Sequence, residues 1–258
     1  MMFKGTLLGL LLMGWTITAI FLLSFNLLLT LFGKRFFAAF LSQFVDTYNS
    51  VAEPFKTKLF KELNEIKTGD KIKILEIGGG SGANFKYFTS PSEVTIVEPN
   101  PNFVPYFEEN RKKYKSLKIN DMKQGYGEDL KAAGIEDESF DAVIMTLVLC
   151  SVQDQVKCIK EIQRVLKPGG KFFFMEHVLG NNGDNVRYIQ EIVMQGGFWP
   201  CMFDGCCTNR DTFTTMEQTG GWSKLDQTKY ELPASKTNKM FNLTRSVIHP
   251  HLMGVGTK

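Results

Sequence analysis

The sequence has no large excess of charge of either sign. Its 258 residues include 30 lysines and arginines against 27 aspartates and glutamates, so the formal net charge at pH 7 is only +3. Binding to a nucleic-acid backbone calls for a pronounced basic surface, which this balance does not favour. No internal repeat or low-complexity tract is evident, and the length suits one full α/β domain rather than two. We therefore expect no nucleic-acid partner.

Cysteine and histidine are both scarce. There are five cysteines, an odd number without any C-x-x-C pair, and three histidines. These counts argue against a disulfide framework, and free thiols indicate a reducing compartment. Cys201, Cys206 and Cys207 lie close together in the sequence, but no histidine lies near them. We interpret them as ordinary thiols and expect no metal site.

One long segment has no charge at all. The 29 residues Gly5–Gly33 are uncharged, and Lys34 and Arg35 follow them. A membrane-spanning helix needs about 20 apolar residues, whereas the apolar core of a cleaved signal peptide has about 7–15. The run therefore favours a retained hydrophobic anchor helix over residues 1–35. Such an anchor could span the membrane, lie in its interface or fold back as a hairpin.

The next segment, residues 36–69, has apolar residues at helical spacing. These residues form an apolar stripe of Phe36, Phe37, Phe40, Leu41 and Phe44. The stripe either rests on the membrane surface or packs on the catalytic domain. The free cysteines favour a catalytic domain that faces the cytosol. Asn242 lies in an N-L-T glycosylation sequon. Glycosylation of this residue in cells would instead place the domain in the lumen.

After residue 70 the pattern changes to short β-rich runs that alternate with helical ones. Buried strands are predicted at 71–78, 94–99, 117–125, 141–149 and 171–178. Helices are predicted over Pro101–Tyr114 and Val152–Leu166, and the sequence KPGG ends the second. Such alternation predicts a doubly wound, parallel α/β sheet in residues 70–258. Ligands bind beyond the carboxyl ends of the strands of such a sheet, at the switch point.

The stretch EIGGGSGANF follows the first predicted strand and fits two cofactor-binding templates. Gly78, Gly80 and Ala83 satisfy the dinucleotide fingerprint G-x-G-x-x-G/A. Glu98 lies 20 residues after Gly78, where an acid would hold a ribose. Taken alone, this template indicates a nicotinamide-dependent oxidoreductase.

The second template is the S-adenosylmethionine turn, acid-x-G-x-G-x-G, which Glu76 and Gly82 complete together with Gly78 and Gly80. A dinucleotide carries a pyrophosphate that prefers bare amides at a helix N-terminus. S-adenosylmethionine has no phosphate and carries an ammonium group, which a carboxylate such as Glu76 can anchor directly or through water. An acid at this position would be less welcome beside a pyrophosphate.

Residues after the turn favour S-adenosylmethionine further. Glu98 can accept both ribose hydroxyls, Glu128 or Asp129 can accept from the adenine amino group, and residues 146–151 lie over the site. The predicted cofactor-binding residues are Glu76, Gly78, Gly80, Gly82, Asn84, Glu98, Pro99, Asn100, Gly127, Glu128, Asp129, Thr146 and Leu147.

This ordered set of motifs, over residues 71–178, resembles the class I S-adenosylmethionine-dependent methyltransferases. The resemblance implies a Rossmann-like, seven-stranded, mostly parallel sheet whose last strand is antiparallel. The sequences KLDQTKYEL and HPHLMGVGTK, at 224–232 and 249–258, are suitable for the sixth and seventh strands.

A narrower resemblance spans nearly the whole chain. The apolar N-terminus and the sequences LEIGGGSGANFKYF, EPNPNF, TLVLCSV, LKPGGKFFFMEHV, DGCCTNRDT and HPHLMG are together similar to the membrane-anchored thiol S-methyltransferases, the methyltransferase-like protein 7 family. This resemblance implies methylation of small lipophilic alkyl thiols at the endoplasmic reticulum membrane and lipid droplets. Two positions depart from the family pattern: Gly79 stands where cysteine is common, and Glu98 where aspartate is.

The chemistry implied is in-line attack of a thiolate on the sulfonium methyl group. Free thiols titrate near a pKa of about 8.5, so modest help with deprotonation suffices. His177 is predicted as a base or substrate-orienting residue, with a structural histidine as its alternative. Asp204 is a second candidate, with a turn residue as its alternative. Phe198, Trp199 and Phe203 are candidates for the wall of an apolar acceptor pocket.

Three broader alternatives stay open at this point. The chain could methylate another small molecule or a lipid. It could be an oxidoreductase that uses a nicotinamide cofactor, since the dinucleotide fingerprint is satisfied. It could also be a membrane or lipid-droplet protein that keeps the cofactor fold without activity.

Overall fold

The computed structural model describes residues 2–66, 71–89 and 91–258. In the first helix, α1 (Met2–Asn64), the side chains of residues 2–14, 17–23 and 25–31 lie outside the description. Among the described residues, no helix is both long and apolar enough to cross a membrane. The predicted anchor over residues 1–35 falls mainly on the side chains that are not described, so it stays a prediction.

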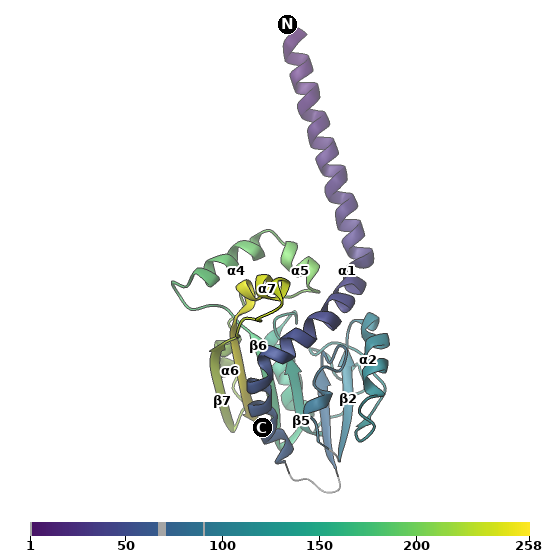
Figure 1. Cartoon of the computed structure of the whole chain (residues 1–258), viewed down its shortest axis with the longest axis vertical. Helices are drawn as coiled ribbons and strands as arrows, with labels where there is room; N and C mark the ends of the chain where they lie inside the picture. The colour runs from purple at the N-terminus through teal and green to yellow at the C-terminus, as the bar shows by residue number, and fades with distance from the viewer. Residues whose placement is uncertain (1, 67–70, 90) are drawn as a thin grey trace.

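A single twisted sheet forms the centre of the molecule (Figure 1). Its order is β3-β2-β1-β5-β6-β8-β7, and β4 also pairs with β2. All described pairings are parallel except those that β8 makes with β6 and with β7. The strands are β1 (Ile72–Ile77), β2 (Ser92–Glu98), β3 (Lys118–Ile119), β4 (Lys123–Gln124), β5 (Phe140–Thr146), β6 (Leu166–His177), β7 (Lys224–Glu231) and β8 (Pro250–Thr257). The predicted mostly parallel sheet with an antiparallel last strand is confirmed, but it has eight strands among the described residues rather than the predicted seven.

Helices cover both faces of this sheet. Besides α1, the helices are η1 (Phe85–Tyr87), η2 (Pro101–Phe103), α2 (Val104–Arg111), α3 (Gln155–Val165), α4 (Asn185–Gln195), α5 (Phe198–Met202), α6 (Thr212–Thr219) and α7 (Lys239–Ile248). Of these, α4 and α5 lie beyond one end of the sheet (Figure 1). Side chains of α1, α2 and α7 pack with Phe173 of β6 on one face. Side chains of α3 and α6 pack with Phe172 and Phe174 on the other. Successive residues of a strand point to opposite faces, so the run of phenylalanines serves both cores.

Three predicted boundaries were wrong. The third strand is broken into β3 and β4, because it pairs with β2 only at two short places and Asn120 turns its side chain back to Thr95. The helix predicted from Val152 begins at Gln155, because the Asp154 carboxylate caps it by accepting from Lys157 N. The KPGG sequence lies inside β6 rather than in a turn, where Gly169 and Gly170 pair with the chain end at Lys258.

The segment at 36–64 packs into the core. Its aromatic rings meet the catalytic domain at Phe37–Phe103, Phe40–Phe203 and Phe44–Phe241, with centroid separations of 6.0, 5.7 and 5.1 Å. Phe36, in contrast, is 51% exposed. Most of the predicted stripe therefore packs on the domain, as one of the two interpretations expects. Residues of α1 also line the apolar pocket described below.

Candidate active site

The glycine turn after β1 adopts a backbone that only glycine tolerates well. Gly78, Gly80 and Gly82 have φ of 64°, 52° and 79°, in the left-handed region that other residues rarely adopt. A Cβ atom on Gly82 would lie 2.2 Å from the Phe85 ring, and one on Gly78 would lie 2.4 Å from Val148. The turn is thus fixed both by its conformation and by its close packing.

A cavity of about 420 Å³ opens beside this turn, at the carboxyl ends of the strands. This volume lies within the usual range of small-molecule sites. Its lining includes six of the sequence-predicted site residues or their neighbours: Gly78, Pro99, Tyr126, Gly127, Glu128 and Asp204. The dispersed motifs of the sequence therefore meet at one place in the fold.

Glu98 ends β2 and is 5% exposed. Its two carboxylate oxygens accept hydrogen bonds from Gly80 N at 3.0 Å and Asn100 N at 2.9 Å. Burial raises the pKa of Glu98 to about 7, although these two amides act in the opposite direction. Each oxygen keeps a free lone pair for a further donor.

Asn100 and Asp204 complete this side of the site. The Asn100 amide donates to Asp204 Oδ2 and to the Lys34 carbonyl oxygen, both at 3.0 Å. Asp204 has a positive φ of 47°, which is uncommon for a residue with a side chain. The Asp204 side chain lines the cavity of about 420 Å³ and does not line the apolar pocket described below. Its predicted catalytic role stays a prediction.

Glu76 lies at the centre of a buried polar network. Its Oε1 accepts from Asn84 Nδ2 at 2.7 Å, and the same amide nitrogen donates to Thr146 Oγ1 at 3.0 Å. Burial raises the pKa of Glu76 to about 7. Its second oxygen, Oε2, is buried without a hydrogen-bond partner among the described residues. Such an orphaned acceptor indicates that a donor from a ligand belongs there.

Sequence reasoning missed the far end of this network. Lys56 of α1 is 1% exposed, and its Nζ donates to Asn49 Oδ1 and Asn84 Oδ1, each at 2.7 Å. Burial lowers the pKa of Lys56 to about 7, although Glu76 acts in the opposite direction. A signal was present in the sequence, since Lys56 shares the buried helical face of Ala52 and Phe60.

The segment after β5 is shaped by a second buried acid. Leu147 has a positive φ of 60°, a strained conformation that costs of order 1–3 kcal/mol. Glu176 holds the next residue, because both of its oxygens accept from Val148 N, at 3.0 and 2.9 Å. Burial raises the pKa of Glu176 to about 7. Thr146 joins the network of Asn84 and Glu76, and Leu147 lines the apolar pocket described below. Their predicted contacts with the cofactor stay predictions.

A small apolar pocket of about 60 Å³ lies on the α1 side of Leu147. Its walls come from α1, α5 and α7, and its lining includes Phe37, Phe40, Leu41, Phe44, Trp199, Phe203 and Ile248. Of the three residues predicted to wall an acceptor pocket, Trp199 and Phe203 do so, whereas Phe198 is 55% exposed and absent from the lining.

His177 ends β6 and lines this pocket together with Ser151 and Thr244. It is 3% exposed, and its Nε2 lies 3.1 Å from Cys206 Sγ. Burial opposes protonation of the imidazole, but Cys150 and Glu176 outweigh it and raise the pKa of His177. The other two histidines do not line the pocket, although His251 is the register partner of His177 on β8. His249 pairs with Glu231, and His251 is buried against Tyr48.

Comparison with known proteins identifies the family. Residues 75–174 match the family described as methyltransferase domain. The human thiol S-methyltransferase TMT1A is 33% identical over 226 residues, 87% of each chain. The rat thiol S-methyltransferase TMT1B is 35% identical over 207 residues, covering 80% of this chain and 79% of the relative. This chain belongs to the thiol S-methyltransferase family.

The likeness to solved structures concerns the fold alone. An S-adenosylmethionine-dependent methyltransferase from Thermotoga maritima superposes with a TM-score of 0.54 at 15% identity, over 88% of this chain and 99% of its own. The carbon methyltransferase CurJ gives a TM-score of 0.55 at 18% identity, over 80% of this chain and 55% of its own. The family member described here is thus a class I methyltransferase in fold as well as in sequence.

Membership of this family decides between the two cofactor templates. The methyltransferase uses S-adenosylmethionine as its methyl donor, and the nicotinamide alternative falls away. The residues present fit this cofactor, because the unpartnered Glu76 oxygen and the free lone pairs of Glu98 suit its ammonium and ribose hydroxyl donors. The roles of the individual residues stay predictions.

Of the two acids predicted at the adenine end of the methyltransferase site, only one faces the cavity. Glu128 lines it and accepts from Gln153 N. Asp129 is exposed and caps a turn by accepting from Ala132 N at 3.1 Å. Glu128 is therefore the better candidate for the adenine contact.

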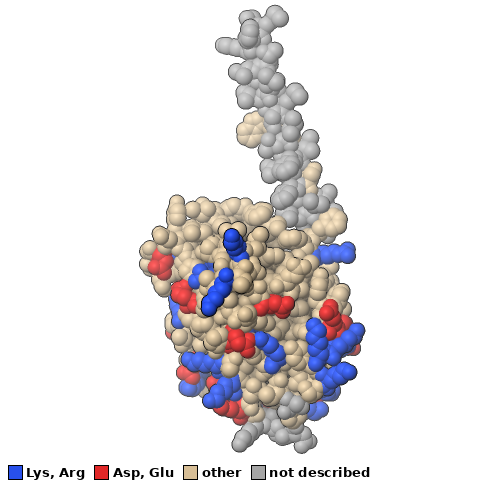
Figure 2. Space-filling view, viewed as in Figure 1, with Lys and Arg blue, Asp and Glu red and all other residues tan. Residues whose placement is uncertain are grey.

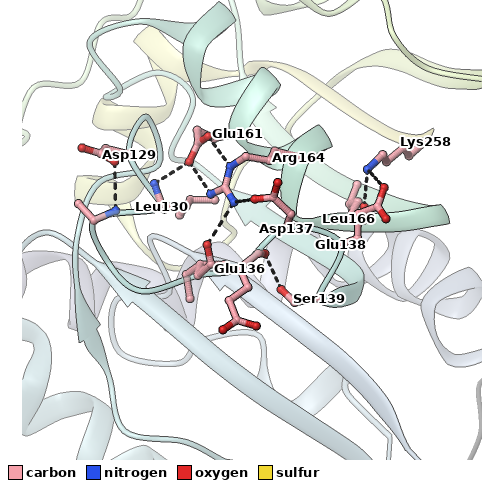
Figure 3. A network of polar contacts seen from close by, with 12 residues as sticks. Asp129, Leu130, Glu136, Asp137, Glu138, Ser139, Glu161, Arg164, Leu166 and Lys258 are labelled. Carbon is pink, nitrogen blue, oxygen red and sulfur yellow. Dashed lines mark hydrogen bonds and ion pairs between the residues drawn. The ribbon is translucent and has the colours of Figure 1, made fainter.

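A polar network holds this loop against α3 (Figure 3). Arg164 makes a two-pronged ion pair with Glu161 at 2.7 and 2.8 Å and also pairs with Asp137. Glu161 in turn accepts from Leu130 N at 2.9 Å. Arg164 thus fixes the loop that carries Gly127 and Glu128, from outside the cavity.

Proposed function

We propose that this enzyme transfers the methyl group of S-adenosylmethionine to the sulfur of small lipophilic thiols. One observation carries the proposal: an aromatic pocket of about 60 Å³ shares Ser151 with the lining of the large cavity and has buried His177 in its wall. Its aromatic lining suits an apolar acceptor. The names of the human and rat relatives support a thiol as the methyl acceptor.

The residues of the chain would act mainly by positioning the thiol and excluding water. When bound, S-adenosylmethionine supplies an electrophilic methyl group on a sulfonium. Phe40, Phe44 and Trp199 would hold the alkyl part of the thiol and keep its sulfur aligned. His177 would orient the sulfur or take its proton, and only modest help is needed because thiols titrate near a pKa of about 8.5.

An apolar surface beside the pocket supports delivery of the substrate from a membrane. It is formed by exposed side chains of α1, α4, α5 and α7, namely Phe32, Phe36, Tyr188, Ile189, Ile192, Phe198, Met240 and Leu243. These elements lie at one end of the body, toward the N-terminal part of α1 (Figure 1). Charged side chains gather mainly on the opposite half in this view (Figure 2). Contiguous exposed apolar surface of this kind is typical of membrane contact.

We extend the proposal to location, with the anchor at residues 1–35 in the membrane of the endoplasmic reticulum or on lipid droplets. The catalytic domain would face the cytosol, where its five cysteines stay reduced. Asn242, whose glycosylation would argue otherwise, has both amide atoms bonded to the backbone of Ser235 at 2.8 Å. This arrangement favours an unmodified side chain.

The test compares a linear alkyl thiol with the alcohol and the amine of the same chain length. The full chain is incubated with each acceptor and S-adenosylmethionine labelled in its methyl group, and the products are identified by mass spectrometry. We expect the methyl thioether and no methyl ether or methylamine. Turnover of the alcohol, the amine or a lipid, but not the thiol, would keep the enzyme class and refute the substrate. Binding of the cofactor without turnover of any acceptor would favour the inactive alternative.

A further inference from the structure

Three sulfur and nitrogen ligands meet at the base of the apolar pocket. Cys150 follows β5, His177 ends β6, and Cys206 follows α5. One atom of each, the two Sγ atoms and a ring nitrogen of His177, lie within 4.8 Å of one another. All three side chains are at least nine-tenths buried, with exposures of 2%, 3% and 8%.

The spacing fits tetrahedral zinc after small side-chain shifts. Zinc binds cysteine sulfur at about 2.3 Å and histidine nitrogen at about 2.0–2.1 Å, so its ligand atoms lie roughly 3.5–3.8 Å apart. The atoms of this cluster lie within 4.8 Å of one another, so shifts of about 1 Å would bring them to that geometry. Two thiolates and one neutral imidazole around a divalent ion carry no net charge, which suits a pocket walled by aromatic rings.

Two further features, one contact and one buried atom without a partner, indicate that a ligand belongs at this cluster. The Trp199 indole Nε1 donates to Cys206 Sγ at 3.4 Å, as outer groups commonly do around metal-bound thiolates. The Nδ1 atom of His177 is buried without a partner among the described residues. The two sulfur atoms and His177 Nε2 have partners in the protein, so Nδ1 is the atom of the cluster that a bound ion would supply with one.

We propose that Cys150, His177 and Cys206 bind one zinc ion whose fourth position faces the apolar pocket and takes the sulfur of the substrate thiol. Three protein ligands with one open position are the usual pattern of a catalytic rather than a structural zinc site. This inference rests on the proposed thiol substrate. It also goes against the sequence-based expectation of no metal, which considered Cys201, Cys206 and Cys207 and could not see that the fold brings His177 to Cys206.

The zinc ion would make the thiol nucleophilic without a protein base. As the zinc–sulfur bond forms, the S–H bond breaks and its proton leaves to solvent, because a coordinating thiol is deprotonated outright. The sulfur then forms a bond to the donated methyl carbon. The donor's own carbon–sulfur bond breaks with its electron pair on S-adenosylhomocysteine, and the neutral thioether leaves the metal. In this scheme His177 serves as a ligand.

The test measures metal content and a spectroscopic signature. Purified full-length enzyme is expected to retain about one zinc per chain after dialysis. Replacement by Co²⁺ should give a thiolate-to-cobalt absorption band that shifts when an alkyl thiol is added. Cys206→Ser should lose both the metal and the band, whereas Cys201→Ser, at an exposed thiol of α5 outside the cluster, should keep both.

Cys206→His keeps a zinc ligand at the position, so retained metal in this variant would support the site even if the serine variant fails to fold. Wild-type protein without bound metal and without the cobalt band would overturn the proposal. A Cys150–Cys206 disulfide found by mass spectrometry under reducing-cytosol conditions would do the same. Full thiol turnover in the metal-free enzyme would refute the role of zinc while the proposed function stands. A metal-loaded enzyme that methylates no thiol would show the reverse.

Discussion

Replacing Glu98 by glutamine gives the sharpest test of the cofactor site. The carboxylate accepts from the amides of Gly80 and Asn100, and its free lone pairs are predicted to accept both ribose hydroxyls. A glutamine offers only one acceptor oxygen, so its NH₂ group would oppose one of the two N–H donors. With its one oxygen shared among these donors, glutamine leaves a ribose hydroxyl of the bound cofactor without an acceptor, which costs about 1–3 kcal/mol of binding free energy, and the remaining bonds lose the strength that a charged acceptor gives them.

Together these losses amount to roughly 2–4 kcal/mol, which corresponds to about 30- to 1,000-fold weaker cofactor binding. Isothermal titration calorimetry with S-adenosylmethionine measures it. Glu93→Gln is the matched control, because Glu93 lies on the same strand but pairs with Lys118 and Lys71 near the surface. An affinity for Glu98→Gln within threefold of the wild type, with an unchanged melting temperature, would refute the reasoning.

The remaining predictions concern the supports of the site. Burial raises the pKa of Glu98 to about 7, so the carboxylate is ionised above that pH and cofactor affinity should rise between pH 6 and 8. The same pH dependence of affinity in Glu98→Gln would show that another group causes it. Lys56→Met leaves the Asn49 and Asn84 oxygens unpaired and should cost about 3–5 kcal/mol of unfolding free energy. This loss would lower the melting temperature by roughly 10 °C, whereas Lys58→Met, at an exposed position, should change it little. Equal melting temperatures of the two variants would show that the network does not stabilise the fold. Gly79→Cys places a Cβ atom 2.8 Å from Ile96 Cγ2 and should cost about 1–3 kcal/mol of unfolding free energy. The Ile96→Ala change removes Cγ2 and should relieve part of this cost in a double-mutant cycle; additive effects would mean that the two side chains do not collide. Arg164→Leu should release the loop that bears Glu128, which would speed hydrogen exchange at residues 125–139 and weaken cofactor binding several-fold. Arg111→Leu, which breaks a surface ion pair, should leave the exchange rates and the affinity unchanged. Unchanged exchange at 125–139 in Arg164→Leu would show that Arg164 does not hold the loop.

The part of the site that depends on local sequence could be predicted. The turn at Gly78–Gly82 follows directly from β1, and Glu98 ends the next strand, so strand order and glycine spacing locate both. His177 was placed at the site because the carboxyl ends of parallel strands share one edge. Each of these inferences needs only the alternation of strand and helix.

The rest depends on contacts between distant segments. Lys56 reaches Asn84 and Asn49 reaches the Ala83 carbonyl oxygen only because α1 lies across the sheet. The helical spacing places Lys56 on a buried face but does not say which residue it meets there. The cluster of Cys150, His177 and Cys206 draws on three separate elements. The broken third strand shows a related limit, since its pairing with β2 is decided at the sheet edge by side chains such as Asn120.

The central claim is that the apolar pocket presents a thiol sulfur to the methyl group of the cofactor held at Glu76 and Glu98. A crystal structure with S-adenosylmethionine and the alcohol of the same chain length, as an unreactive stand-in for the thiol, tests this most directly. We predict the alcohol oxygen in the pocket beside His177, within about 3.5 Å of the methyl carbon. An alcohol bound outside the pocket of Phe40 and Trp199, or a cofactor whose methyl group points away from it, would contradict the account.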